Sequence, residues 1–134
     1  MLTFDVNWIA IVVLMIVNMG LGAVWYGPLF GKPWMAATGI KLEDIEGKNM
    51  MPPYVVAIVN SFFMAFFMAN VLAWTGTESW GGGLLLGLFM WLGFTGFSFG
   101  VNHAFEMRSL HLWIINSGMY LVGLLIMGAV LAIW

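Results

Sequence analysis

The densest group of reactive side chains lies at the end of the third apolar stretch of the chain. It comprises Asn102, His103, Glu106, Arg108 and His111. His103 and Glu106 are three residues apart, so they share a helix face, and with His111 they offer two nitrogens and one oxygen to a metal. The histidines could also ligate a haem or chlorophyll metal. Neither spacing is a known ligand motif and Arg108 can pair with Glu106, so no metal or cofactor is predicted, and metal or pigment binding stays an alternative.

The rest of the sequence contains no catalytic pattern. No nucleophile stands beside a base, and neither a glycine-rich phosphate loop nor a zinc motif occurs. We therefore expect a protein that is not an enzyme. Four basic residues in 134 cannot form the positive footprint that nucleic acids require, so no nucleic-acid partner is expected.

The elements that position these residues are four long apolar stretches. The chain is 63% hydrophobic and 7% charged, whereas soluble domains are about 25% charged. A helix needs about 20 apolar residues to cross a hydrocarbon layer of about 30 Å, and residues 6–26, 53–74, 82–105 and 110–134 qualify. They lack the alternation of barrel strands. The prediction is one all-α integral membrane domain, residues 1–134, with four transmembrane helices in a lipid bilayer.

The loops between these stretches indicate an orientation. All four basic residues lie in the first loop, residues 27–51, or in the third loop, and none lies on the opposite side. The positive-inside rule places these loops in the cytoplasm and both termini outside. In the first loop, Pro33 suits the first turn of a helix, and the residues after it predict a short helix in the membrane interface.

Hydrogen-bonding side chains follow regular spacings within the spans. In the third span they form one stripe at intervals of three and four residues, and each span carries an amide. Amides in lipid must find partners, at about 0.6 to 2 kcal/mol each. They predict either bonds that join the helices or a polar path or ligand pocket between them. The residues of such a path are Thr95, Ser98, Asn102, Asn18, Asn60 and Asn116.

Small side chains form further stripes, which are typical of helices whose backbones approach closely in membranes. Because the third span combines a small stripe with a polar one, we expect it to be the central helix of the bundle. The candidate packing residues are Gly93, Gly96 and Gly100 of the third span and Ser61, Ala65 and Ala69 of the second.

A short internal sequence repeat suggests two similar helical hairpins. Residues 58–61, Ile-Val-Asn-Ser, resemble residues 114–117, Ile-Ile-Asn-Ser. Such a repeat would relate the two hairpins by an axis along the membrane normal.

Residues 25–34, Trp-Tyr-Gly-Pro-Leu-Phe-Gly-Lys-Pro-Trp, resemble the signature after the first helix of a bacterial family known as domain of unknown function 1761. The Asn, Phe-Glu and Arg of residues 102–108 and the Ile-Asn-Ser-Gly-Met-Tyr of residues 115–120 are similar to that family's other marked stretches, in the same order. The resemblance covers nearly the whole chain. It implies a small four-helix bacterial membrane protein and supplies no activity. With the basic loops, it predicts the bacterial inner membrane.

Two functions fit these observations. One is a homo-oligomer or an accessory subunit of a larger membrane complex, which needs packing faces and no active residues. The other is a small uncoupled channel or transporter for a small solute, suggested by the amide on every helix. Proton coupling is disfavoured, because the first span lacks the membrane-embedded carboxylate of small multidrug exporters and only Asp5 precedes it.

Overall fold

The computed structural model describes residues 2–134, which form helices joined by short loops, with no strand in this range. Four helical segments are long and apolar enough to cross a membrane: Trp8–Leu29, Met51–Thr75, Trp80–Phe105 and Leu110–Ile133. This confirms the all-α prediction with four spans. The helices are α1 (Trp8–Val24), the π-helix η1 (Trp25–Leu29), α2 (Gly31–Thr38), α3 (Leu42–Ile45), α4 (Met51–Thr75), α5 (Trp80–Met90), the π-helix η2 (Trp91–Thr95), α6 (Gly96–Phe105) and α7 (Leu110–Ile133).

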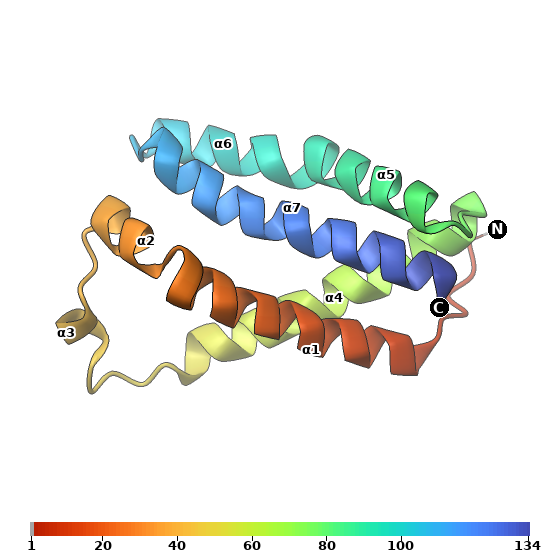
Figure 1. The fold of residues 1–134 in the computed structure, drawn as a ribbon, viewed down its shortest axis with the longest axis horizontal. Coiled ribbons are helices and arrows are strands. Elements are labelled where there is room, and N and C mark those ends of the chain that lie inside the picture. The colour runs from red at the N-terminus through yellow and green to blue at the C-terminus, as the bar shows by residue number, and fades with distance from the viewer. Residues whose placement is uncertain (1) are drawn as a thin grey trace.

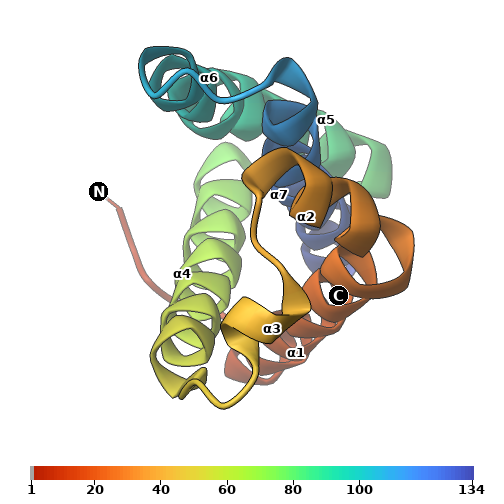
Figure 2. The same ribbon diagram turned by 90° about the vertical axis from the view of Figure 1, so that its left-hand side faces the viewer.

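The two ends of the bundle differ in content. α1 begins, α7 ends and α4 turns into α5 at one end, called here the terminal end (Figure 1). The predicted short helix α2, the helix α3 and the α6–α7 turn lie at the opposite end, the loop end. Seen from the loop end, α4 and α1 stand on either side and the chain from α2 to α3 runs between them (Figure 2). The basic loops therefore share one end.

Local sequence determines where the spans begin and end. The side chains of Asn7, Ser79 and Ser109 each accept a hydrogen bond from a backbone N–H of the first turn that follows, which satisfies a donor that no helix carbonyl can reach. α4 ends at Gly76, whose φ of 66° is left-handed and suits glycine. Each span therefore has at least one end determined by a local signal.

The two π-helices, η1 and η2, interrupt the α-helical geometry of the first and third spans. η1 contains Pro28, which has no backbone N–H to donate, and both η1 and η2 begin with tryptophan. The indole N–H of Trp25 donates to the Ile115 carbonyl and that of Trp91 to the Ser117 carbonyl, both at 2.8 Å. Each π-helix is thereby tied to the same part of α7.

The central helix is α7, which contacts α1, α2, α4, α5, η2 and α6. The expectation that the third span is central is wrong. The tightest helix contact joins α5 to α7, where a Cβ on Gly83 would collide with the Gly128 carbonyl and one on Gly87 with the Leu124 carbonyl. Gly83, Gly87 and Gly128 therefore line the contact between the two helices of the second hairpin, which we call the seam.

The predicted glycine stripe of the third span does not form this seam. Gly93 is exposed, with no described atom near the position of a Cβ, while Gly96 and Gly100 face the indole rings of Trp91 and Trp113. A close approach requires a small residue on the opposing helix, here Gly128, and spacing within one helix cannot reveal that partner. The three glycines instead leave room for aromatic rings or face outward.

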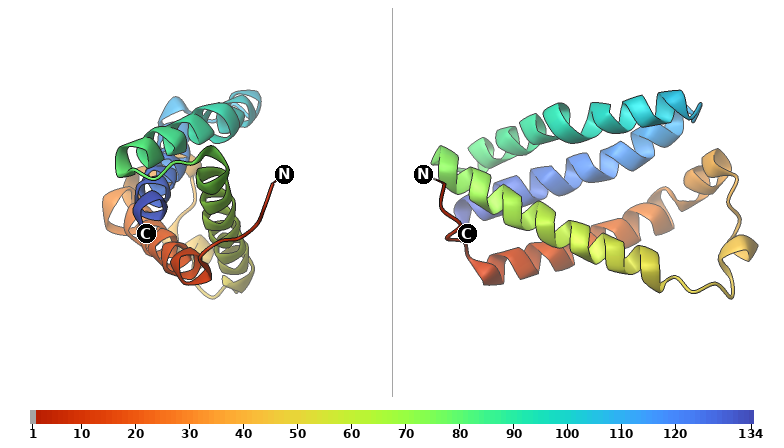
Figure 3. Two further views of the ribbon diagram at one scale, coloured as in Figure 1. Left: turned by 90° about the vertical axis from the view of Figure 1, so that its right-hand side faces the viewer. Right: turned by 180° about the vertical axis from the view of Figure 1, so that it is seen from behind.

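The terminal half of the bundle holds the apolar core. α4 crosses α1 (Figure 3), and the predicted small residues Ser61 and Ala65 are buried while Ala69 is partly buried against the core. Apolar side chains from α1, α4 and α7 form the core of this half, and the buried amide of Asn70 on α4 lies among them in sequence. The buried core residues are Ile11, Leu14, Ala65, Met68, Leu72, Leu124 and Met127.

Candidate functional site

The loop half of the bundle encloses a cavity of about 550 Å³ between α1, η1, α4 and α7. We call it the main cavity. Its lining is mostly apolar, and none of the described residues that line it is an acid, a lysine, an arginine or a histidine. Two of its lining residues near the loop end, Gly27 and Tyr54, are exposed. The polar lining residues are Asn18, Tyr26, Tyr54, Asn60, Ser61 and Tyr120.

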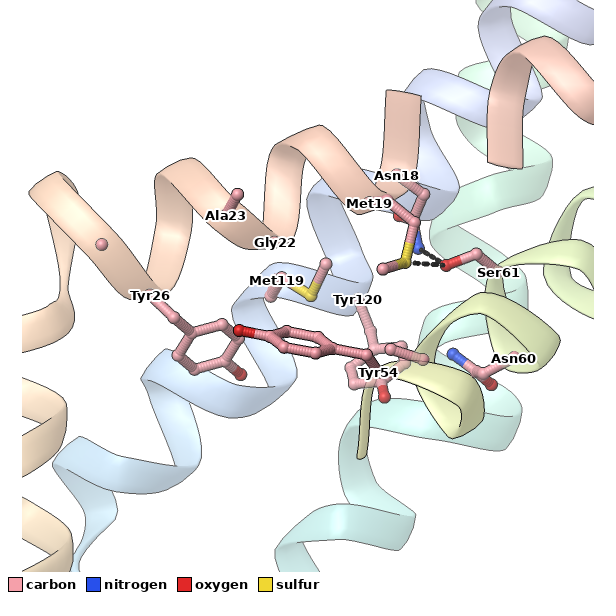
Figure 4. Close-up of a pocket in the computed structure, with 12 residues that line it drawn as sticks. Asn18, Met19, Gly22, Ala23, Tyr26, Tyr54, Asn60, Ser61, Met119 and Tyr120 are labelled. Carbon is pink, nitrogen blue, oxygen red and sulfur yellow. Dashed lines mark hydrogen bonds between the residues drawn. The ribbon is translucent and has the colours of Figure 1, made fainter. Parts of the chain in front are cut away.

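The three tyrosine rings gather at one end of the main cavity, and Asn18, Ser61 and Met19 stand at the other (Figure 4). Tyrosine and methionine both offer apolar contact surface, and tyrosine adds a hydroxyl. The cavity thus combines an apolar body with a few separate polar atoms, the usual character of a small-molecule site.

A buried polar layer separates the main cavity from the apolar core. The Asn18 amide donates to the Ser61 hydroxyl at 2.8 Å, and both side chains are buried. The Asn18 carbonyl oxygen has no hydrogen-bond partner and faces Gly123 of α7, where a Cβ would lie 2.6 Å from it. Asn18 therefore joins α1 to α4 by a hydrogen bond and to α7 by close backbone contact.

A second cavity, of about 360 Å³, lies between η1, α6 and α7 and shares Tyr26 and Tyr120 with the main cavity. We call it the polar cavity. In its wall the Tyr26 hydroxyl donates to the Asn116 carbonyl oxygen at 3.0 Å, and the Asn116 amide nitrogen lies 3.3 Å from His103 Nε2. His103 Nδ1 lies 2.8 Å from the Phe99 carbonyl. Because a carbonyl only accepts, Nδ1 carries the proton and Nε2 accepts from Asn116.

These contacts bear on the metal-site alternative. Both nitrogens of His103 are hydrogen-bonded, and Glu106 pairs with Arg108 at 2.9 Å between a carboxylate oxygen and the Nε atom. His111 is exposed at the start of α7. No group of three potential metal ligands occurs in the described part of the chain, so His103, Glu106 and His111 do not form the metal site that the sequence left as an alternative.

A third cavity, of about 270 Å³, lies between α4 and the third span and shares Asn60 with the main cavity. We call it the lateral cavity. Among the predicted path residues, Asn18 and Asn60 line the main cavity, Asn102 and Asn116 the polar cavity, and Thr95 the lateral cavity.

The exception among the predicted path residues is Ser98. It is exposed on α6 and lines none of these three cavities. The predicted stripe of the third span is therefore divided between two cavities and the outer surface. The predicted path amides of the other spans, Asn18, Asn60 and Asn116, by contrast, line the main or the polar cavity.

Sequence reasoning did not assign the tyrosines to the site. Tyr26 and Tyr120 line both the main and the polar cavity and so lie between them. Tyr54, in the first turn of α4, lines the main cavity. Tyr26 lies within the stretch 25–34 and Tyr120 within 115–120, so the resemblance already marked both. No signal in the sequence distinguished Tyr54 from an interfacial tyrosine.

Comparison with known proteins identifies the family. Residues 9–132 match the family described as Protein of unknown function (DUF1761). Because the match covers nearly the whole chain, the protein belongs to that family. Comparison with curated proteins and with solved structures found no match.

Proposed function

We propose that this member of the DUF1761 family is an uncoupled carrier for a small, uncharged solute in the bacterial inner membrane. The main cavity carries the proposal, because its volume of about 550 Å³ lies within the range of about 300 to 1,000 Å³ that small-molecule pockets occupy. The loop end faces the cytoplasm and both termini face out, as the four basic loop residues indicate.

The lining favours an uncharged solute. An ion without a counter-ion is expensive to bury in an apolar cavity, and the described lining offers no charged partner. The same absence of acidic, basic and histidine side chains from the described lining favours passage without proton coupling and a role that is neither enzymatic nor cofactor-dependent. Solute enters from the loop end, and passage requires the Asn18 layer and the core beyond it to open.

Cysteine accessibility tests the open end directly, because the chain contains no cysteine. Ala57 lines the main cavity, whereas Ala65 lies eight residues further along α4, about 12 Å at 1.5 Å per residue, and is fully buried in the core. In proteoliposomes of known orientation, a membrane-impermeant maleimide should label Ala57→Cys from the loop side and leave Ala65→Cys unlabelled. Equal protection of both positions would contradict an open cavity.

Flux measurements test the carrier function itself. Liposomes containing the protein should release small neutral solutes faster than empty liposomes, and ions no faster. The matched control is the variant Ala57→Trp, which fills the cavity and should abolish the difference while the protein stays folded. Equal release from protein-containing and empty liposomes for every neutral solute would refute the proposal.

A second candidate is a homo-oligomer or a subunit of a larger membrane complex. Ser98 and Asn102 favour it, because both are exposed on α6 and hydrogen-bonding groups in lipid gain from a partner helix. The mass of the protein in native detergent solution tests this role. A monomer that recovers no partner from membranes would exclude it, whereas a dimer lost in Ser98→Leu would support it.

A further inference from the structure

Two hydrogen-bond donors in the wall of the main cavity are bonded to sulfur. The Asn60 side-chain amide donates to the Met64 thioether at 3.3 Å, and the Ser61 hydroxyl donates to the Met19 thioether at 3.6 Å. Thioether sulfur is a weak acceptor. Both donors therefore have an available partner that a stronger acceptor would readily replace.

The positions of these donors suit a ligand. Asn60 and Ser61 both line the main cavity, and Met19 lines it beside them (Figure 4). Methionine is flexible and tolerates rearrangement, so its sulfur can withdraw from Ser61 and its side chain can still cover an apolar ligand surface. Exchanging a thioether for an oxygen acceptor turns a weak bond into an ordinary one without leaving a donor unpaired.

We infer that the main cavity selects neutral molecules that carry a carbonyl oxygen on an apolar, ring-containing body, with Asn60 as the residue that recognises the oxygen. This inference rests on the carrier function proposed above and names its solute class. A carbonyl oxygen only accepts hydrogen bonds, which matches the donors of Asn60 and Ser61. The body lies against the rings of Tyr26 and Tyr120 and the side chain of Met119, which line the same space.

Three naphthalene compounds of similar size form the test: acetylnaphthalene, isopropylnaphthalene and naphthoate. They present a ketone, a hydrocarbon of similar size and an anion. Binding is measured by equilibrium dialysis on protein in lipid nanodiscs, with empty nanodiscs subtracted. The ketone should bind about fivefold more tightly than the hydrocarbon, the difference that one net hydrogen bond supplies. Naphthoate should bind most weakly.

Variants of the donor and of its sulfur partner should act in opposite directions. Asn60→Leu should remove the preference for the ketone, and Met64→Leu should increase it severalfold because the amide then has no internal acceptor. Asn70→Leu is the matched control, since Asn70 is a buried amide on the same helix that lines none of the three cavities. It should leave the preference unchanged.

Infrared spectroscopy of acetylnaphthalene labelled with carbon-13 at the carbonyl supplies an independent readout. The carbonyl stretch should lie at lower frequency in the wild-type protein than in Asn60→Leu, since hydrogen bonding weakens the bond. If ketone and hydrocarbon bind equally in every variant, the inference fails and the carrier function stands. If none of the three compounds binds above empty nanodiscs, the inference fails too, and the flux measurements decide the carrier function separately.

Discussion

The terminal half and the loop half of one bundle are built from the same four spans, yet the apolar core lies in the first and the main cavity in the second. In the terminal half, Gly83 and Gly128 bring two backbones into contact, and apolar side chains of α1, α4 and α7 form a contiguous core. In the loop half, Tyr26, Tyr54 and Tyr120 surround a cavity of about 550 Å³. Close backbone contact distinguishes the terminal half, and polar atoms around a cavity distinguish the loop half.

The two hairpins also differ, because each uses its similar Asn-Ser pair in another way. The repeated residues Asn60 and Ser61 face the main cavity and α1, whereas Asn116 binds Tyr26 and the Ser117 hydroxyl donates to the Trp113 carbonyl of its own helix. Two similar tetrapeptides therefore have different roles. Substitutions at the α5–α7 contact, at the Asn18 layer and at single polar bonds should therefore lower the free energy of unfolding by different amounts.

The largest effect is expected from Gly83→Ala. Its Cβ would collide with the Gly128 backbone, which cannot move without separating α5 from α7, so we expect a loss of about 3 kcal/mol, at the upper end for overpacked sites. Gly93→Ala is the control, because its Cβ would enter open space, and it should be neutral or stabilising. Reversible unfolding in mixed micelles measures both. Equal stability of the two variants would mean that the seam is not tight.

Gly123→Ala should disturb the boundary between the halves by a smaller amount. Its Cβ would lie 2.6 Å from the Asn18 carbonyl oxygen, and a side chain can adjust where a backbone cannot, so about 1 to 2 kcal/mol is expected. A double-mutant cycle with Asn18→Ala should recover about 1 kcal/mol of this loss as coupling. Strict additivity would show that the two residues do not meet.

Tyr26→Phe should cost about 1 kcal/mol, because it removes the hydroxyl that donates to the Asn116 oxygen. Tyr54→Phe changes the same atom on an exposed ring and should have no measurable effect. The nitrogen-15 signal of His103 Nε2 should also shift in Tyr26→Phe, since Asn116 links the two side chains. An unchanged signal would indicate that the chain of hydrogen bonds is not continuous.

The smallest effect is expected from Asn70→Leu, in the terminal half. The Asn70 side chain is fully buried, its amide donates to the Phe66 carbonyl, and its own oxygen has no partner. Replacing an amide that is only half satisfied by an apolar side chain of similar size should be neutral or stabilising by about 0.5 kcal/mol. A clear loss of stability in the same unfolding measurement would show that the oxygen has a partner in the membrane.

Much of the site could be anticipated from residue types alone. Five of the six path residues line cavities, and four of these five are amides, which are costly to expose to lipid and need polar surroundings between helices. Ser98 does not, since a hydroxyl can remain on an exposed helix face at little cost. The metal set was not formed because His103 turns both nitrogens toward partners on α6 and α7, and helix spacing alone does not show which partners are nearest.

The sequence by itself determined the four spans, the interfacial helix and the shared end of the basic loops. These follow from local quantities: apolar length against bilayer thickness, capping side chains and charge. Only the tertiary structure decided that α7 is central, that Gly83 meets Gly128 and that the main cavity lies in the loop half. In lipid all faces of an apolar helix are nearly equivalent in hydrophobicity, so the rotation of each helix depends on side chains of its neighbours that are distant in sequence.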